Sequence, residues 1–286
     1  ESRDGIRTRS YFGVYTVTTR RNPPSRQLTH GTTLHGVQNL TPGGETEPTS
    51  YYARRSGVGY ALASLPIFHD SNAAVGVVGL GTGTLSCYAQ PGQDWRFFEI
   101  DPAMVRIARN PSIFTFLSRC APQAKVVLGD ARLSLGREPA GRLDLLAVDA
   151  FSSDAIPIHL LTREALQVYR RALKPDGLLL VHISNRYLDL EPVLHAAAKR
   201  DGWHAAAFDY SPAAQEEGRN LSRSVWVAMT KDADTLMTLR IASADDAHLW
   251  RPLLGRPGFP GWTDDYSSIL PLLEDWNAWL PGLLKP

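Results

Sequence analysis

The stretch VGVVGLGTGT (residues 75–84) joins a short apolar run to a glycine-rich loop. Four more apolar runs, each bounded by Gly, Asp or Pro, follow it along the chain: WRFFEI (95–100), KVVLG (125–129), LDLLAVD (143–149) and LLLVHIS (178–184). Continuous apolar runs of this length are typical of strands buried on both faces of a parallel sheet. Helical patterns fall between the runs, so the alternation predicts an α/β fold with a Rossmann-like, doubly wound sheet.

Capping residues predict where two of the intervening helices begin. Asp101 precedes Pro102, which suits an N-cap followed by a proline in the first turn. Thr162 is predicted to cap a helix over 163–173. KPDG (174–177) is predicted to end that helix and to turn into the next strand.

The N-terminal part of the chain differs from this pattern. SYFGVYTVTTR (10–20) has the aromatic and β-branched content of a strand, and turn signals follow at Asn22-Pro23-Pro24 and Pro42-Gly43-Gly44. Two more strands are predicted late in the chain, at 204–209 and 224–230. We therefore expect a small β-rich domain at 1–50, the Rossmann-like domain at 51–235 and a C-terminal segment packed on it at 236–286.

Charge balance and cysteine content narrow the function classes. Thirty Lys and Arg face 29 Asp and Glu, so no basic surface for nucleic acid is predicted. Cys87 and Cys120 belong to no CxxC pair and no zinc-type cluster, and we expect two reduced core thiols and no metal site. No apolar run reaches the roughly 18–20 residues that span a bilayer, and no signal peptide is visible. We expect a cytoplasmic protein, with a membrane segment upstream of Glu1 as an alternative.

The glycine loop lies where α/β sheets bind nucleotides, beyond the carboxyl end of a strand. Gly79, Gly81 and Gly83 follow the first strand and would let the backbone approach a ligand closely. The dinucleotide fingerprint GxGxxG requires a glycine at its sixth position, which is Thr84 in this chain. The loop therefore disfavours a dinucleotide without excluding one.

Three acids follow successive strands and add specificity to the loop. Glu99 ends the second strand, where a carboxylate can accept hydrogen bonds from both ribose hydroxyls. Asp130 follows the third strand, in position to accept from an adenine amine, and Asp149 ends the fourth. Any one of them alone could be a helix-capping acid, but three in succession indicate an adenosine site. No phosphate-binding P-loop is present, so the expected donor is an adenosyl sulfonium.

This order of motifs resembles the class I AdoMet-dependent methyltransferase fold and, more closely, the spermidine synthase family of polyamine aminopropyltransferases. DAFSSDAIP (149–157) resembles that family's DSSDP segment, with two residues inserted after Asp149. LHGVQ (34–38) resembles its LDGVxQ segment, and SYYARR (50–55) resembles the stretch that bears a substrate-site tyrosine. The ending TDDYSSILPLL (263–273) resembles members in which the domain follows a membrane segment.

The resemblance implies roles for individual residues. The donor, decarboxylated AdoMet or AdoMet, would be bound by Gly79, Gly81, Thr82, Gly83, Glu99, Asp130 and Ala131. The polyamine acceptor would be handled by Asp149, Asp154 and Tyr52, with Asp149 also beside the donor. On its residue type alone, Tyr52 fits packing as well as substrate contact. The family needs no metal, and its N-terminal β domain helps to build a homodimer.

Three positions depart from the family pattern. The family's GGGDGG is GLGTGT here, which places Thr82 where the family has an acid. The Asp of LDGVxQ is His35, and Phe12 replaces a glutamine that usually follows an N-terminal tyrosine. In the resembled enzymes the acid faces the amino end of the aminopropyl tail. Neutral Thr82 therefore predicts weaker discrimination against AdoMet.

The expected reaction is an SN2 displacement, in which an amine nitrogen attacks the carbon beside the sulfonium and methylthioadenosine leaves. An aliphatic amine has a pKa of about 10 and must first lose a proton, for which Asp154 and then Asp149 are the predicted acceptors. Two alternatives stay open: an AdoMet-dependent methyltransferase, and a non-catalytic domain that senses an adenosyl metabolite. His30 and His35 are expected to be ordinary polar loop residues, not metal ligands.

Overall fold

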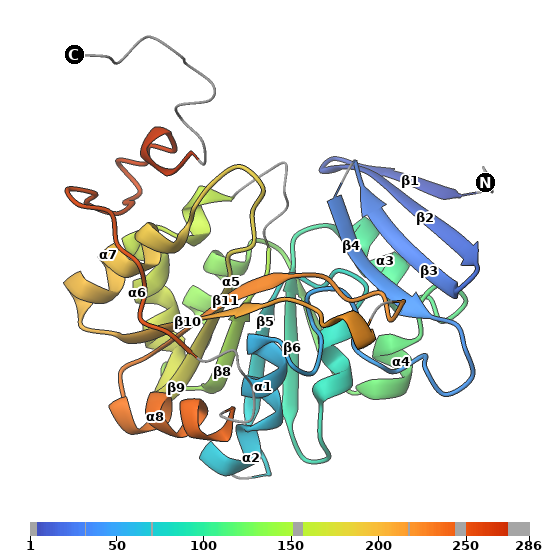
Figure 1. Cartoon of the computed structure of the whole chain (residues 1–286), viewed down its shortest axis with the longest axis horizontal. Helices are drawn as coiled ribbons and strands as arrows, with labels where there is room; N and C mark the ends of the chain where they lie inside the picture. Colours follow the sequence, from blue (N-terminus) through green and yellow to red (C-terminus); the bar gives the residue numbers. More distant parts are fainter. Residues whose placement is uncertain are drawn as a thin grey trace.

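The structure is a computed structural model, and it describes residues 5–31, 33–69, 71–150, 157–216, 218–243 and 250–273. Two β-sheets form its framework: a four-stranded sheet near the N-terminus and a seven-stranded sheet flanked by helices. Figure 1 shows the smaller sheet standing beside β6 and α3 of the larger unit. Asp154 and the other residues of 151–156 lie outside the described residues.

The smaller sheet is an antiparallel meander of β1 (Ile6–Ser10), β2 (Gly13–Arg21), β3 (Pro24–His30) and β4 (Thr33–Asn39). Residues 10–20, predicted as one strand, span the turn between β1 and β2, where Ser10 pairs with Gly13. Gly13 has a φ of 138°, and a Cβ there would collide with the ring of His30. The tight turn therefore requires glycine, which divides the predicted strand in two.

The larger sheet confirms the predicted Rossmann-like topology, with the order β10-β11-β9-β8-β5-β6-β7. Neighbours from β7 to β9 in this order are parallel, whereas β11 runs antiparallel to both β9 and β10. The chain passes from β5 to β6 and β7 on one side and then returns to β8 on the other, so β5 and β8 flank the switch point. The strands are β5 (Ala74–Val78), β6 (Asp94–Glu99), β7 (Lys125–Leu128), β8 (Leu143–Val148), β9 (Leu173–His182), β10 (His204–Tyr210) and β11 (Ser224–Thr230).

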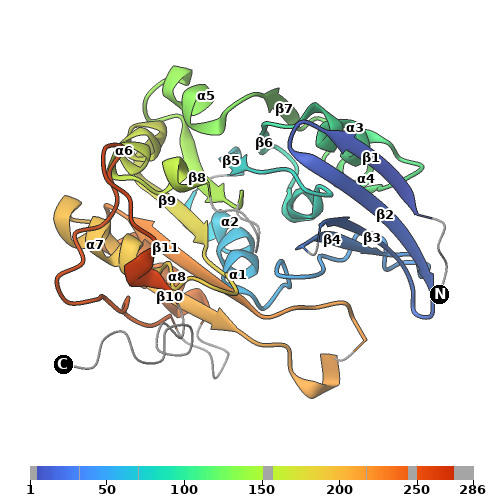
Figure 2. The same cartoon turned by 90° about the horizontal axis from the view of Figure 1, so that it is seen from above.

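Helices cover both faces of the larger sheet (Figure 2). Val75 and Val77 of β5 lie in one core with residues of α1 (Gly57–Ala63), α3 (Pro102–Arg109) and α8 (Ala233–Ala242). Val78, on the opposite face, lies in a second core with α5 (Ala131–Arg137), α6 (Arg163–Ala172) and α7 (Glu191–Asp201). The shorter elements are α2 (Leu65–Phe68), η1 (Thr84–Tyr88), α4 (Phe116–Cys120), η2 (Ile158–Leu160), η3 (Ala214–Glu216) and η4 (Leu270–Leu272). Alternating side chains of a strand thus feed two separate cores.

Local signals placed both predicted helix starts correctly. The carboxylate of Asp101 accepts from the amide of Ala103, and the hydroxyl of Thr162 accepts from the amide of Ala165. Residues 174–177, predicted to end the helix and to turn into the next strand, fall within the range of β9, which starts directly after α6. They have no partner in β8, because Leu173 pairs with Leu143 and the next pair is Leu178 with Leu145, so the chain bulges out between two paired parts of the strand.

Asp101 also joins the two sheets. Its Oδ2 accepts hydrogen bonds from the hydroxyls of Ser10, at 2.5 Å, and Tyr15, at 2.7 Å, while Oδ1 caps α3. Because Asp101 is only 1% exposed, these bonds are made away from competing water. The acid that starts α3 therefore fixes where β1 and β2 stand relative to the glycine loop.

The C-terminal segment from Trp250 to Leu273 packs on the larger unit. Trp262 and Leu272 are fully buried in the core that contains α6 and α7, and the amide of Arg163 donates to the carbonyl of Trp262 at 2.9 Å. Among the described residues, no helix is both long and apolar enough to cross a membrane.

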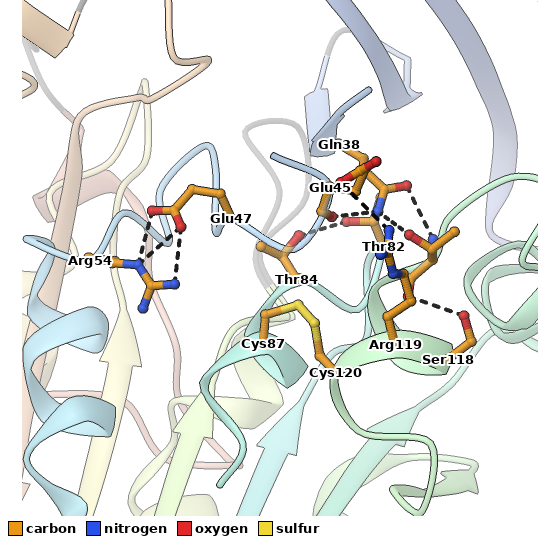
Figure 3. The surroundings of a disulfide bond; sticks show 11 residues. Gln38, Glu45, Glu47, Arg54, Thr82, Thr84, Cys87, Ser118, Arg119 and Cys120 are labelled. Carbon is orange, nitrogen blue, oxygen red and sulfur yellow. Dashed lines mark hydrogen bonds and ion pairs between the residues drawn. A yellow bond between two sulfur atoms is a disulfide. The ribbon is translucent and has the colours of Figure 1, made fainter. Parts of the chain in front are cut away.

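The expectation of two reduced thiols is wrong, because Cys87 and Cys120 form a disulfide (Figure 3). The bond joins η1, directly after the glycine loop, to the last residue of α4. The cysteines are 33 residues apart in the sequence. Their pairing depends on the packing of η1 against α4, which no sequence motif predicts. Disulfides persist mainly in oxidising compartments, so the cytoplasmic location stays a prediction.

We predict that the double variant Cys87→Ser/Cys120→Ser unfolds at lower denaturant concentration than the wild type. Closing a loop of 33 residues removes entropy from the unfolded chain, and its loss should lower the free energy of unfolding by about 3–4 kcal/mol. Urea titration measures the difference. Reductant should lower wild-type stability equally and leave the variant unchanged; equal stability of wild type and variant without reductant would contradict the prediction.

Candidate active site

A cavity of about 390 Å³ lies at the carboxyl ends of β5, β6 and β8, between the two sheets. This is the volume range of small-molecule sites, and the switch point is where open α/β sheets bind ligands. The larger sheet and its loops supply most of the wall, and the smaller sheet supplies the side that faces the glycine loop. The polar side chains of the wall are Tyr15, His30, His35, Tyr51, Tyr52, Glu99, Asp130, Asp149 and His159.

Two glycines of the loop line the cavity, and the structure shows why no larger residue fits. Gly79 has a φ of 92°, and a Cβ there would lie 2.4 Å from the carbonyl oxygen of Asp149. Gly81 has a φ of 52°, and its Cβ would lie 2.9 Å from the carbonyl oxygen of His35. Both positions combine a left-handed backbone with a close neighbour, which only glycine tolerates.

Thr82 and Gly83, in contrast, are not among the described residues that line the cavity. Thr82 is 1% exposed, and its hydroxyl lies 2.9 Å from that of Thr84. The same side chain packs on Gly36, where a Cβ would come within 2.2 Å of its oxygen. The side chain of Thr82 therefore packs the glycine loop against β4. This geometry does not support the donor-selecting role that was expected for Thr82.

Glu99 ends β6 at the floor of the cavity and organises the loops around it. Its Oε2 accepts from the amide of Leu80 and its Oε1 from the amide of Asp101, both at 2.9 Å. Burial raises the pKa of this carboxyl group, while the amide hydrogen bonds act in the opposite direction. A carboxylate oxygen can accept more than one hydrogen bond, so Glu99 retains acceptor capacity towards a ligand.

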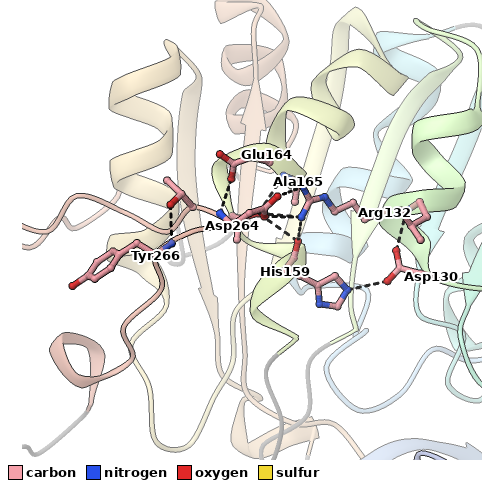
Figure 4. A network of polar contacts seen from close by, with 10 residues as sticks. Asp130, Arg132, His159, Glu164, Ala165, Asp264 and Tyr266 are labelled. Atoms are coloured by element: carbon pink, nitrogen blue, oxygen red, sulfur yellow. Dashed lines mark hydrogen bonds and ion pairs between the residues drawn. The ribbon is translucent and has the colours of Figure 1, made fainter.

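Asp130 lies at the opposite end of the floor, at the start of α5, with Ala131 beside it in the wall. One oxygen of Asp130 caps α5 by accepting from the amide of Leu133, and the other lies 3.0 Å from Nε2 of His159 (Figure 4). His159 is half-exposed and follows the segment 151–156 in the chain. Sequence reasoning missed His159, because a lone histidine after a loop carries no motif.

The C-terminal segment reinforces this end of the cavity. Arg132, next to Ala131, forms a two-pronged ion pair with Asp264, with N–O distances of 2.7 and 2.5 Å (Figure 4). Asp264 also accepts from the hydroxyl of Thr162, and the guanidinium of Arg132 lowers the pKa of its carboxyl to about 2. The TDDY stretch (263–266) therefore stabilises, through Asp264, the segment that contains Asp130.

The carboxylate of Asp149 contacts two side chains of other segments through hydrogen bonds. Its Oδ2 accepts from the hydroxyl of Tyr52 at 2.5 Å, and its Oδ1 lies 2.7 Å from Nδ1 of His182. Tyr52 is buried, and burial together with the charge of Asp149 raises the pKa of its phenol well above the ordinary value. The structure thus brings together Asp149 and Tyr52, which the sequence had placed in one site. His182 was missed, although it stands at the carboxyl end of a predicted strand.

Two histidines of the smaller sheet face the glycine loop across the cavity. The rings of His30 in β3 and His35 in β4 lie 5.7 Å apart, centre to centre, so they belong to strands and not to a loop as predicted. Nε2 of His35 is buried and has no hydrogen-bond partner among the described residues. Burial, reinforced by His30, lowers the pKa of His35 to about 4. His35 is therefore uncharged near neutral pH.

We compared the sequence and the fold with those of known proteins. No protein-family model matches the chain. A polyamine aminopropyltransferase from Vibrio vulnificus is 31% identical over 126 residues, which is 42% of this chain and 40% of that protein. The chain therefore aligns with less than half the length of this curated relative.

Solved structures extend the match to most of the fold. A probable spermidine synthase from Corynebacterium glutamicum covers 93% of this chain and 99% of its own, with a TM-score of 0.68 and 15% identity. Spermidine synthase from Thermotoga maritima covers 82% and 74%, with a TM-score of 0.56 and 14% identity. A spermidine synthase in complex with the transition-state analogue AdoDATO covers 88% and 79%, with a TM-score of 0.56 and 15% identity.

The fold is the α/β fold of these spermidine synthase structures, with a small antiparallel sheet added at the N-terminus. The matches agree with the resemblance to the spermidine synthase family that the motifs indicate. Among the residues that the structure describes, no group of three or more His, Cys, Asp or Glu side chains could hold a metal ion.

We predict that His35 makes the fold less stable in mild acid. With a pKa of about 4 when folded and 6.5 when unfolded, the group binds a proton more readily in the unfolded chain between those values, so stability falls as the pH drops. Between pH 7.5 and 5.0 its contribution should fall by about 2 kcal/mol. The measurement is urea unfolding of the wild type and His35→Gln at both pH values. An equal loss in both proteins would show that His35 is not the group responsible.

Proposed function

We propose that the protein is an aminopropyltransferase that moves an aminopropyl group from decarboxylated AdoMet to a polyamine and releases methylthioadenosine. The observation that carries the proposal is the Asp149 carboxylate, held by Tyr52 in the wall of a cavity that also contains Glu99 and Asp130. The cavity thus combines acceptors suited to a nucleoside with a carboxylate suited to an amine. The similarity to a polyamine aminopropyltransferase supports the same reaction.

The donor would lie along the floor of the cavity. Glu99 would accept hydrogen bonds from the ribose hydroxyl groups. Asp130, beside Ala131, would accept a hydrogen bond from the adenine amine. Gly79 and Gly81 would let the backbone approach the thioether end of the nucleoside. Because His159 already contacts Asp130, it would have to share that carboxylate with the adenine.

The acceptor would enter as an ammonium ion, because an aliphatic amine has a pKa of about 10. Asp149 would hold this cation. From the family resemblance, Asp154 would accept one of its protons, with Asp149 as the second candidate, after which the nitrogen lone pair can attack. The new N–C bond forms while the C–S bond breaks, and the sulfonium becomes a neutral thioether. Holding nucleophile and donor in line would supply much of the acceleration.

Product analysis tests the function directly. The protein is incubated with decarboxylated AdoMet or AdoMet and a mixture of polyamines, and the products are identified by mass spectrometry. Methylthioadenosine and an extended polyamine are expected from decarboxylated AdoMet. S-adenosylhomocysteine would instead establish a methyltransferase, and binding of the nucleoside without turnover would establish a sensor. Association of two copies and a cytoplasmic location belong to the same proposal.

We predict that Glu99→Gln weakens methylthioadenosine binding by about one to two orders of magnitude. Charged acceptors form hydrogen bonds worth roughly 1.5–3 kcal/mol, and the amide replaces one acceptor oxygen with a donor. Isothermal calorimetry measures the dissociation constant. Glu47→Gln, an exposed acid outside the cavity, is the matched control and should bind as the wild type does. Unchanged affinity in folded Glu99→Gln would remove Glu99 from the ribose site.

We predict that Asp149→Asn and Asp154→Asn each lower turnover by about 100-fold or more, the usual scale for loss of a proton acceptor. Methylthioadenosine affinity should change little, because neither carboxylate is assigned to the nucleoside floor. Steady-state rates at saturating donor, together with calorimetry, separate the two effects. A variant that lost nucleoside affinity but kept its rate would show that we have assigned the acids to the wrong substrate.

A further inference from the structure

His182 is buried at the carboxyl end of β9, in contact with Asp149, the carboxylate that is proposed to hold the acceptor amine. It is 5% exposed. Its ring stacks on the indole of Trp226 at 4.6 Å between centres with 16° between planes, and the ring of Tyr51 lies 5.1 Å away. The indole nitrogen of Trp226 donates to the carbonyl of Tyr51, so these aromatic neighbours are themselves tied together. The imidazole is therefore held in one orientation, with its two nitrogens pointing to Asp149 and Ser184.

The partners of the two ring nitrogens of His182 indicate which nitrogen carries the proton. Nδ1 lies 2.7 Å from Oδ1 of Asp149, and a carboxylate can only accept, so Nδ1 carries the proton and donates. Nε2 lies 2.8 Å from the Ser184 hydroxyl, which can donate to it while its oxygen accepts from the amide of Val225 at 2.8 Å. In this arrangement each of these polar groups has a partner.

We propose that His182 is a positioning residue: its Nδ1–H donates to Oδ1 of Asp149 and orients that carboxylate towards the acceptor amine. The proposal rests on the function proposed above. Tyr52 and His182 take one lone pair from each oxygen of Asp149 and leave the other lone pairs for the ammonium ion.

The test measures amine binding without turnover. Calorimetry with 1,4-diaminobutane or spermidine is run at pH 7.5 and saturating methylthioadenosine, using the wild type, His182→Gln and His182→Leu. The glutamine amide can donate to Asp149, whereas leucine cannot donate. We expect His182→Gln to retain the amine affinity of the wild type and His182→Leu to bind amine about tenfold more weakly.

Methylthioadenosine affinity, measured first, should be unchanged in both variants, which separates positioning of Asp149 from general damage to the fold. Wild-type amine affinity in His182→Leu, or an equal loss of amine affinity in His182→Gln and His182→Leu, would overturn the role of His182 while leaving the proposed function intact. If the wild type binds methylthioadenosine but neither amine, the proposed acceptor and the role of His182 towards it are overturned together. Nitrogen-15 NMR gives an independent check, because a neutral ring with its proton on Nε2 would contradict the assignment.

Discussion

The site depends on one buried carboxylate, that of Asp149, at the carboxyl end of β8. A buried charge is costly unless it is paired or hydrogen-bonded, and here the phenol of Tyr52 and the imidazole of His182 meet that requirement. These two donors come from the segment before α1 and from the end of β9, while Asp149 itself is anchored by its amide to the carbonyl of Val78. The demand for hydrogen-bond partners therefore holds three separate segments around one end of the cavity.

The second constraint is the attachment of the smaller sheet. Asp101 caps α3 and at the same time accepts from Ser10 and Tyr15, so a residue needed for a helix start also positions the wall opposite the glycine loop. The rings of His30 and His35 in that wall lie 5.7 Å apart, and burial lowers the pKa of His35. A ligand between the sheets would have carboxylates on one side and imidazole rings on the other. This asymmetry suits a cationic donor and a cationic acceptor, which the carboxylates can attract.

The sequence-based predictions were most successful for features that depend on neighbouring residues in the chain. The strands of the larger sheet, the caps at Asp101 and Thr162, and the placement of Glu99, Asp130 and Asp149 at strand ends were all readable from local pattern. Residues 174–177 were predicted as a turn because Pro and Gly usually mark one; they fall within the range of β9, but none of them pairs with β8. Thr82 was assigned to the cavity from its motif position, yet its side chain turns towards Gly36 and Thr84.

By itself, the sequence determined the layer structure and the edge at which the polar residues gather. Apolar periodicity sets strands and helices, and the carboxyl ends of parallel strands necessarily meet at one edge. Tertiary structure alone decided the partners within that edge: Tyr52 and Asp149 are 97 positions apart, and Arg132 and Asp264 are 132 apart. It also decided that Cys87 meets Cys120 and that His182 meets Asp149. Such contacts depend on how the packed elements cross, and residue spacing along the chain does not encode those crossings.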